Sequence, residues 1–327
     1  MNTHSQEVSR GERYGFGKNW KRFLRTMDEE RVHEAERSLR EMLQMETMAG
    51  KSLLDAGSGS GLFSLAAMRL GADRVHSFDY DPQSVACTKE LKRRFFPQTD
   101  KWTIEEGNVL DVTYLSRLGK FNIVYSWGVL HHTGNMWLGL ENVSDRVKDG
   151  GILFVAIYND QGRASRVWRA VKVLYNRSFV YRILITPLYL ACMVAHGLAL
   201  DLIGWNNPFS RYLKYPKRRG MSLFPDVLDW LGGYPFEVAK PGEITGFYKT
   251  RGFALINSTL SKGGKGRGNN QYIFLKDIGP EQSLHETPRV ARESTNPSAC
   301  RRFREPRFRL ELSRTEQEID SRISWTN

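Results

Sequence analysis

The sequence has little cysteine and no recognisable leader. Its 327 residues include three cysteines, Cys87, Cys192 and Cys300, which stand far apart and form no CxxC pair. This excludes a disulfide scaffold and a structural zinc site, and it fits a reducing compartment. The N-terminal stretch MNTHSQEVSRGERYG contains no apolar run of the kind that secretory signals carry. We therefore expect a cytoplasmic protein without a metal centre.

Acidic residues are also scarce relative to basic ones. Asp and Glu total 36 against 48 Lys and Arg, so the formal net charge is +12, which favours anionic partners. The excess is concentrated in residues 161–219, which hold eleven Lys or Arg and one acid, Asp201. At 40% hydrophobic and 26% charged residues, the composition excludes a wholly disordered chain, a coiled coil and a polytopic membrane protein.

Short apolar runs alternate with helical patterns over most of the chain. Strands are predicted near 52–56, 74–81, 102–111, 121–130 and 152–158, followed by two more at the end of 241–256 and at 271–276. A helical pattern runs from Trp20 to Met48. This alternation predicts an α/β fold, namely a doubly wound, mainly parallel sheet of seven strands with a helical insert after the fifth.

Domain boundaries follow from the same pattern and from composition. The predicted segments are a flexible N-terminus over 1–19, a cofactor-binding core over 20–158, a basic aromatic insert over 159–240, the last helix and strands over 241–277, and a disordered tail over 278–327.

A glycine-rich turn follows the first predicted strand and opens a helix. It reads Asp55-Ala-Gly-Ser-Gly-Ser-Gly61, and glycine permits positive φ and close approach of a ligand to the backbone. The spacing is GxGxG, which differs from the GxGxxG of dinucleotide sites, and the GK[ST] of phosphate-binding loops is missing. A plain strand-to-helix turn with packing glycines is the alternative.

The turn, together with the later strand ends, resembles motif I and its partners in class I S-adenosylmethionine-dependent methyltransferases. The resemblance implies S-adenosylmethionine as cofactor, with Asp79 on the ribose hydroxyls, because a carboxylate accepts two hydrogen bonds from a vicinal diol. Asn108 stands where the family usually has an acid beside adenine. NAD remains the alternative cofactor. The implied cofactor-binding residues are Asp55, Gly57, Ser58, Gly59, Gly61, Asp79, Tyr80, Asn108, Val109, Ser126 and Trp127.

The segments SWGVLHHTG, IYNDQG and DWLGGYPFEVA are similar to those of a bacterial group loosely allied to ubiquinone-type O-methyltransferases. In this comparison His131, His132 and Tyr158 lie at the carboxyl edge of the sheet and are candidate catalytic residues. The nucleic-acid element [DN]PP[YF] is absent after the fourth strand. We expect methyl transfer to oxygen, or to nitrogen, of a small or lipid-like acceptor. A non-catalytic cofactor-binding or membrane-associated scaffold and an RNA or protein methyltransferase are the alternatives.

The basic insert allows three interpretations. Between its basic flanks, residues 183–200 contain no charged side chain. The insert could be a lid over the acceptor, an interfacial membrane element with basic flanks and aromatic boundaries, or a bilayer span, for which the run is short. A peripheral position at the inner membrane surface is consistent with the second interpretation, and nucleic acid is a poor fit to the apolar centre. Trp230, Tyr234 and Phe236 are expected to be buried or to line an acceptor pocket.

Overall fold

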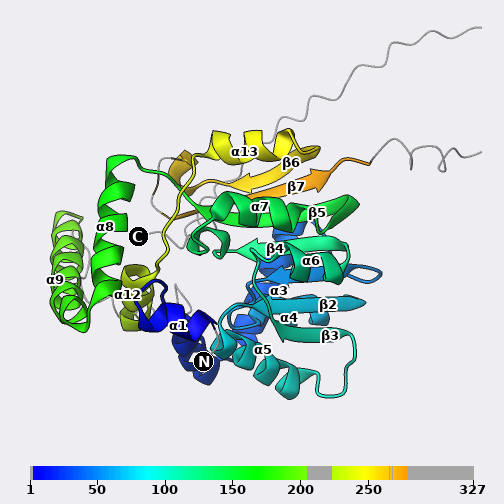
Figure 1. The fold of residues 1–327 in the computed structure, drawn as a ribbon, viewed down its shortest axis with the longest axis horizontal. Coiled ribbons are helices and arrows are strands. Elements are labelled where there is room, and N and C mark those ends of the chain that lie inside the picture. The colour runs from blue at the N-terminus through cyan, green and yellow to red at the C-terminus, as the bar shows by residue number, and fades with distance from the viewer. Residues whose placement is uncertain (1–2, 205–222, 265, 267, 279–327) are drawn as a thin grey trace, which may run out of the picture. The chain divides into compact units, whose positions relative to one another are not determined.

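The computed structural model describes residues 3–204, 223–264, 266 and 268–278. The predicted tail from residue 279 onward, and Arg211 to Arg219 of the basic insert, lie outside the described residues. The described strands form one seven-stranded sheet in the order β3-β2-β1-β4-β5-β7-β6, and Figure 1 shows it flanked by helices. The predicted fold class is confirmed.

The first five strands are parallel, and β7 runs antiparallel between β5 and β6. Parallel strands of this kind are buried on both faces and read as apolar runs. Their carboxyl ends meet at one edge of the sheet, where open α/β sheets bind ligands. The strands are β1 (Ser52–Ala56), β2 (Arg74–Asp79), β3 (Trp102–Glu106), β4 (Phe121–Trp127), β5 (Val147–Tyr158), β6 (Phe253–Thr259) and β7 (Asn269–Lys276).

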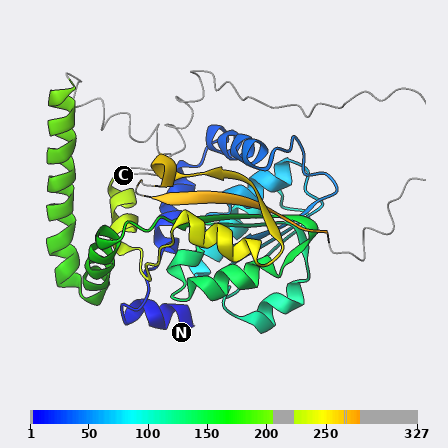
Figure 2. The same cartoon turned by 90° about the horizontal axis from the view of Figure 1, so that it is seen from above.

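Two sets of helices cover the two faces of the sheet. One cluster of buried side chains joins the sheet to α3 (Glu29–Leu43), α4 (Leu62–Arg69) and α5 (Pro82–Phe95). The other joins it to α6 (Val112–Leu118), α7 (Met136–Ser144) and α13 (Pro241–Lys249). Figure 2, in which the molecule is seen from above, shows α13 in front of the sheet, beside α7.

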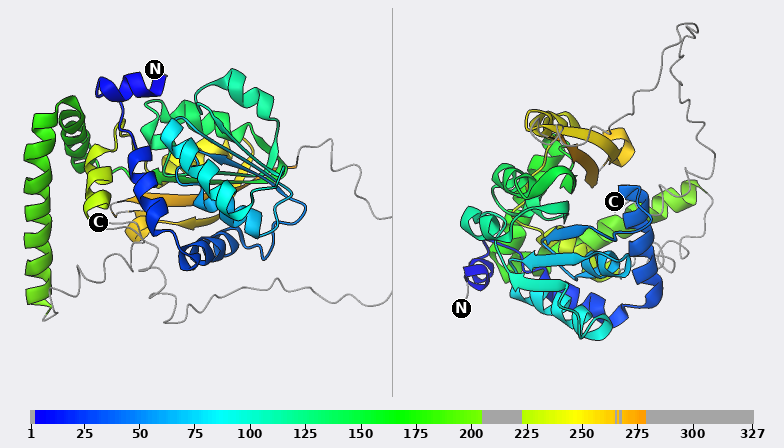
Figure 3. Two further views of the ribbon diagram at one scale, coloured as in Figure 1. Left: turned by 90° about the horizontal axis from the view of Figure 1, so that it is seen from below. Right: turned by 90° about the vertical axis from the view of Figure 1, so that its right-hand side faces the viewer.

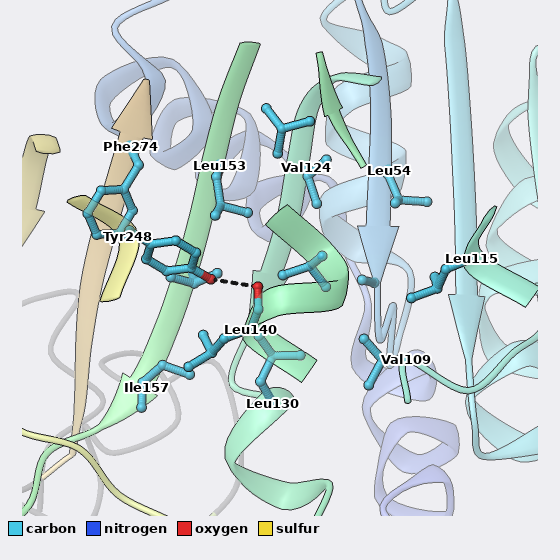
Figure 4. Close-up of a cluster of buried hydrophobic side chains, with 14 of the residues drawn as sticks. Leu54, Val109, Leu115, Val124, Leu130, Leu140, Leu153, Ile157, Tyr248 and Phe274 are labelled. Atoms are coloured by element: carbon cyan, nitrogen blue, oxygen red, sulfur yellow. Dashed lines mark hydrogen bonds between the residues drawn. The ribbon is translucent and has the colours of Figure 1, made fainter. Parts of the chain in front are cut away.

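Figure 4 shows how the second cluster ties the late helix to the centre of the sheet. Tyr248 of α13 is fully buried and donates a hydrogen bond from its hydroxyl to the carbonyl of Leu140 in α7, at 3.2 Å. Phe274 of β7 packs against the Tyr248 ring at 4.6 Å between centroids. The chain after the insert therefore completes the core rather than forming a second one.

The N-terminal region differs from its prediction. Instead of a frayed segment and one helix from residue 20, the structure has α1 (Thr3–Ser9), α2 (Gly17–Phe23), η1 (Leu24–Thr26) and then α3. Asp28 caps α3 by accepting from the backbone N–H of Arg31 at 3.0 Å, which starts a new helix where the apolar period alone predicts continuation.

The insert consists of α8 (Arg163–Arg177), α9 (Phe179–Ile203) and α12 (Leu223–Gly232) within the described residues. A parallel bridge between Asn159 and Ala239 brings its two ends together beside β5. Two 3-10 turns, η2 (Leu130–His132) and η3 (Ser261–Gly264), complete the described elements at this edge.

Candidate functional site at the carboxyl edge of the sheet

The glycine loop is hydrogen-bonded to the end of the neighbouring strand β2. The backbone N–H groups of Gly57 and Ser58 both donate to the carbonyl of Phe78, at 2.9 and 3.0 Å. The next donor, the N–H of Gly59, reaches Oδ2 of Asp79 at 2.9 Å. Gly57, Gly59 and Gly61 all have positive φ, of 87°, 54° and 82°, so this course of the chain requires glycine.

Asp79 is the carboxylate at the centre of this edge. Its Oδ1 accepts from the N–H of Asp81 at 2.8 Å, and the backbone N–H of Tyr80 is a third donor to this carboxylate. Burial raises the pKa of Asp79 to about 6, against the opposing effect of the N–H donors of Asp81 and Gly59. The group is thus ionised near neutral pH and oriented before any ligand arrives.

Three of the predicted cofactor residues use their side chains inside the fold. Asp55 is buried and accepts from the Ser64 hydroxyl at 2.5 Å, and burial raises its pKa to about 7. The Ser58 hydroxyl contacts that of Thr88 at 3.0 Å. The Ser126 hydroxyl donates to the carbonyl of Ala56 at 2.9 Å and thereby fastens β4 to β1. These three side chains therefore support the glycine loop from within the fold.

The remaining predicted cofactor residues lie on the ends of β2, β3 and β4. Asn108 Oδ1 accepts from the N–H of Leu110 at 2.9 Å, which forms a turn after β3. Val109 is buried in the core, and Trp127 packs partly buried at the end of β4. The Tyr80 hydroxyl donates to Glu7 at 3.0 Å.

The N-terminal segment contributes to this edge, which the sequence analysis did not foresee. The N–H of Gly17 donates to Asp81 Oδ2 at 2.8 Å, and the indole of Trp20 lies so close to Gly59 that a Cβ there would sit 3.1 Å from it. Arg13 donates to the carbonyls of His132 and Thr133 at 2.7 and 3.2 Å. Residues 3–20 therefore connect the end of β2 to the turn after β4. No sequence motif around Gly17 or Trp20 indicated these contacts.

Of the two candidate histidines, His132 is the better placed to meet an acceptor. Its Nδ1 lies 2.7 Å from the carbonyl of Pro235, so Nδ1–H donates there and Nε2 carries the lone pair. His131 is 0% exposed and stacks against Tyr158 at 3.9 Å between ring centroids, and its ring nitrogens lack a well-formed hydrogen bond with any described residue.

Burial keeps both histidines neutral. It lowers the pKa of His132 to about 3 and the pKa of His131 well below its ordinary value, with the charge of Lys172 acting in the same direction. A histidine with an ordinary pKa could act as a general base, but a histidine with so low a pKa cannot do so near neutral pH. The structure makes His132 a hydrogen-bond acceptor of low basicity instead.

A small pocket with a volume of about 20 Å³ opens beside Tyr158. Its walls include Trp168 of α8, Trp230 of α12 and Phe236 of the returning chain. The Nε1–H of Trp230 is buried and has no acceptor among the described residues. Two of the three aromatic residues predicted to be buried or to line a pocket, Trp230 and Phe236, therefore lie in its wall.

The neighbouring residues Asn159 and Asp160 hold loops in place. Asn159 donates to the carbonyls of Gly264 and Gly266 at 2.8 and 2.9 Å and accepts from Asn270 at 3.1 Å. Asp160 accepts from the N–H of Gly162 at 2.8 Å. Tyr158, at the end of β5, contributes to the lining of the pocket.

Lys172 is a buried cation that the sequence analysis counted among the surface charges. It is 0% exposed, donates to the carbonyl of Trp230, and its Nζ lies 4.2 Å from the centre of the Trp230 ring. Burial lowers its pKa to about 7, although Asp229 acts to raise it. Its position at i+4 from Trp168 on α8 was the available clue that it faces inward.

Within the described part of the chain, no group of three or more His, Cys, Asp or Glu side chains could hold a metal ion. The functional groups that this edge offers are its carboxylate, histidine, lysine and aromatic side chains.

Parts of this chain are similar to known proteins. Residues 27–184 match the family described as a methyltransferase domain. The ribosomal protein L11 methyltransferase of Alteromonas mediterranea is 55% identical over 47 residues, which are 14% of this chain and 16% of that protein. Its counterpart in Anoxybacillus flavithermus is 39% identical over 69 residues, or 21% of this chain and 22% of that protein. The chain thus spans less than a quarter of these relatives.

Among solved structures, the magnesium protoporphyrin IX methyltransferase of Synechocystis PCC 6803 with bound SAH resembles this chain with a TM-score of 0.44 and 13% identity. The superposition covers 85% of this chain and 89% of that one. A likeness at this level says nothing about the acceptor.

The buried Lys172 predicts a pH-dependent stability. The unfolded chain binds a proton at Lys172 with the ordinary pKa of 10.5 and the folded chain only with a pKa of about 7. Between these values the unfolded state holds more protons, so the free energy of unfolding rises with pH, by up to about 1 kcal/mol per pH unit. In Lys172→Met this rise should disappear, as measured by urea denaturation from pH 7 to 10. The exposed Lys89 provides the control variant Lys89→Met, and an unchanged slope in Lys172→Met contradicts the assignment.

Proposed function

The chain belongs to the class I S-adenosylmethionine-dependent methyltransferases, and from this membership we propose that it transfers a methyl group to an ionisable oxygen of a small or lipid-like acceptor. The observation that carries the proposal is the Asp79 carboxylate, held by the N–H groups of Gly59 and Asp81 at the end of β2. Its two oxygens are the acceptors that would bind the hydroxyls of a ribose diol.

The residues at this edge fit S-adenosylmethionine. The glycine loop brings backbone without side chains to the end of β1, next to Asp79. Asn108 follows β3, where its amide lies at the same edge for contact with adenine. We assign Gly57, Gly59, Gly61, Asp79 and Asn108 to cofactor contact, and Asp55, Ser58 and Ser126 to shaping the loop.

When bound, the cofactor supplies an electrophilic methyl group on a sulfonium. Because the methyl group is already activated, the protein has mainly to align the acceptor and exclude water. His132 Nε2 accepts a hydrogen bond from the acceptor O–H and orients its oxygen, while the carbonyl of Pro235 fixes the ring. When the acceptor oxygen took up the methyl group from the sulfonium, its proton would pass to water, because His132 is too weakly basic to keep it.

The weak basicity of His132 favours an acceptor that ionises readily, such as a phenol, an enol or a carboxylic acid. The cation of Lys172, behind the Trp230 ring, stabilises such an oxyanion electrostatically. The Nε1–H of Trp230, which has no acceptor within the described ranges, offers a hydrogen bond to a ligand oxygen, and the aromatic walls suit an apolar body.

A protein acceptor is the alternative. The two curated relatives described above are named ribosomal protein L11 methyltransferases, but the matching stretches of 47 and 69 residues cover at most 21% of this chain. Such stretches favour a shared cofactor site more than a shared acceptor.

The ribose assignment predicts a large loss of affinity in Asp79→Ala. Removing two hydrogen bonds to a charged group should weaken S-adenosylhomocysteine binding by about a hundredfold or more in calorimetric titration. In the wild type, affinity should fall as the pH drops below about 6, because protonation of Asp79 removes an acceptor lone pair. Asp73→Ala, at the opposite end of β2 and exposed, is the matched control. Equal affinities for the two variants would rule out the assignment.

The role of His132 predicts a defect in turnover without a defect in cofactor binding. His132→Gln should lower kcat about a hundredfold and leave S-adenosylhomocysteine affinity unchanged. Since the pKa of His132 is about 3, the substitution should not alter the shape of the rate profile between about pH 5 and 8. The exposed His33 on α3 gives the control His33→Gln. A wild-type kcat in His132→Gln would exclude the role.

The acceptor class can be identified with methyl-labelled S-adenosylmethionine. A cell extract incubated with the full chain and the labelled cofactor would be divided into lipid, small-molecule, RNA and protein fractions. We expect label in the lipid or small-molecule fraction, absent with the Asp79→Ala chain. Label confined to protein would support the alternative acceptor, and cofactor binding without any transfer would support a non-catalytic scaffold.

A further inference from the structure

Helix α9 presents an apolar face that no described element covers. Figures 1, 2 and 3 show α9 on the outer side of α8 and α12. Among the described helices, it is the one long and apolar enough to cross a membrane, and little of it is buried. Its outer face is defined here by Val180, Leu184, Leu188, Leu198 and Leu202. These residues are spaced by four, or by ten between Leu188 and Leu198, so their side chains share one side of the helix.

The exposure of this face is large. Leu184, Leu188 and Leu202 expose 60%, 66% and 70% of their surface. Ala191 and Ala195, which fall on the same side, are exposed as well. No charged residue occupies this side along the 25 residues of the helix, which is about 37 Å at 1.5 Å per residue.

The polar groups of α9 point the other way. Arg182 donates to the carbonyl of Tyr175 in α8 at 3.1 Å, and Thr186 lies 3.3 Å from the Tyr175 hydroxyl. Asp201 is 4% exposed. A helix that buries its polar side and exposes its apolar side is arranged for an apolar surrounding rather than for water.

The exposed charge on the neighbouring helix α8 is of one sign. Arg163, Arg166, Arg169 and Arg177 of α8 are all exposed, and the single acid between residues 163 and 203 is the buried Asp201. Exposed cations on α8, in the same insert as the apolar strip of α9, complement an anionic lipid surface, where each adds to the attraction of the headgroups. A second protein chain with an apolar face would not require this excess of arginine.

We propose that the outer face of α9 docks on the surface of an anionic lipid bilayer, with the helix lying in the membrane plane. A transbilayer orientation would detach α9 from the protein, because Ile185, Tyr189 and Met193 on its inner side pack in one cluster with α8 and α12. An in-plane orientation keeps these contacts and sinks only the outer leucines into the boundary between headgroups and acyl chains.

Docking in this way brings the acceptor pocket close to lipid. Trp168 of α8, in the pocket wall, contacts Tyr189 of α9 at 5.6 Å between ring centroids. Helix α9 itself therefore separates the pocket wall from the docking face. The inference goes beyond the proposed methyl transfer and does not depend on it.

Vesicle co-sedimentation with the full chain tests the proposal. The wild type should bind vesicles of phosphatidylglycerol and phosphatidylcholine, bind pure phosphatidylcholine more weakly, and lose part of its binding as salt rises. The variant Leu184→Glu/Leu188→Glu should bind the anionic vesicles about a hundredfold more weakly, since each leucine withdrawn from the apolar boundary is worth tenfold or more. Val112→Glu, on the exposed side of α6 with 57% exposure, should bind like the wild type.

A second readout locates the contact on α9. Cys192 is exposed on this helix and Cys87 is buried, so an environment-sensitive fluorophore attached to Cys192 in a Cys300→Ser chain should shift to shorter wavelength on anionic vesicles.

Absence of vesicle binding, or binding unaffected by Leu184→Glu/Leu188→Glu, would overturn the proposal. So would a wild type that forms dimers in light scattering, fails to bind vesicles, and becomes monomeric in the double variant. In that case the face of α9 joins two copies of this chain.

Discussion

The hydrogen bonds between the glycine loop and the end of β2 are the constraint on which the site depends. Three successive backbone N–H groups, from Gly57 to Gly59, bond to Phe78 and Asp79. They fix the loop against the neighbouring strand and, at the same time, orient the Asp79 carboxylate. The loop and its acid are therefore one unit, and the positive φ of the glycines is the condition for that unit to form.

Around this unit, two distant segments close the same edge of the sheet. The N-terminal helices bond to Asp81 through Gly17 and to the turn after β4 through Arg13. The chain returning from the insert bonds to His132 through Pro235. The two ends of this edge differ in chemistry. Charged and backbone groups lie at β2, where a polar cofactor is proposed. Aromatic groups lie at β5, where an apolar acceptor is proposed.

Periodicity and motif spacing predicted the sheet, its parallel order and the placement of Asp79, because these depend on local pattern and on a loop whose conformation only glycine allows. They did not predict the roles of Trp20 or Lys172. Both depend on contacts between residues far apart in sequence, and a tryptophan near a chain end or a lysine in a basic run looks the same whether buried or exposed. The low pKa of His132 also arises from tertiary burial, which no local pattern reveals.

The most direct test of the central claim is hydrogen–deuterium exchange of the full chain with and without S-adenosylhomocysteine. The account predicts slower exchange at residues 57–61 and 79–81, with an accompanying slowing at residues 13–20 because Gly17 and Trp20 contact the same edge, and no change along α9. Saturating ligand that leaves exchange at the glycine loop unchanged would contradict the claim that this loop and Asp79 hold the cofactor.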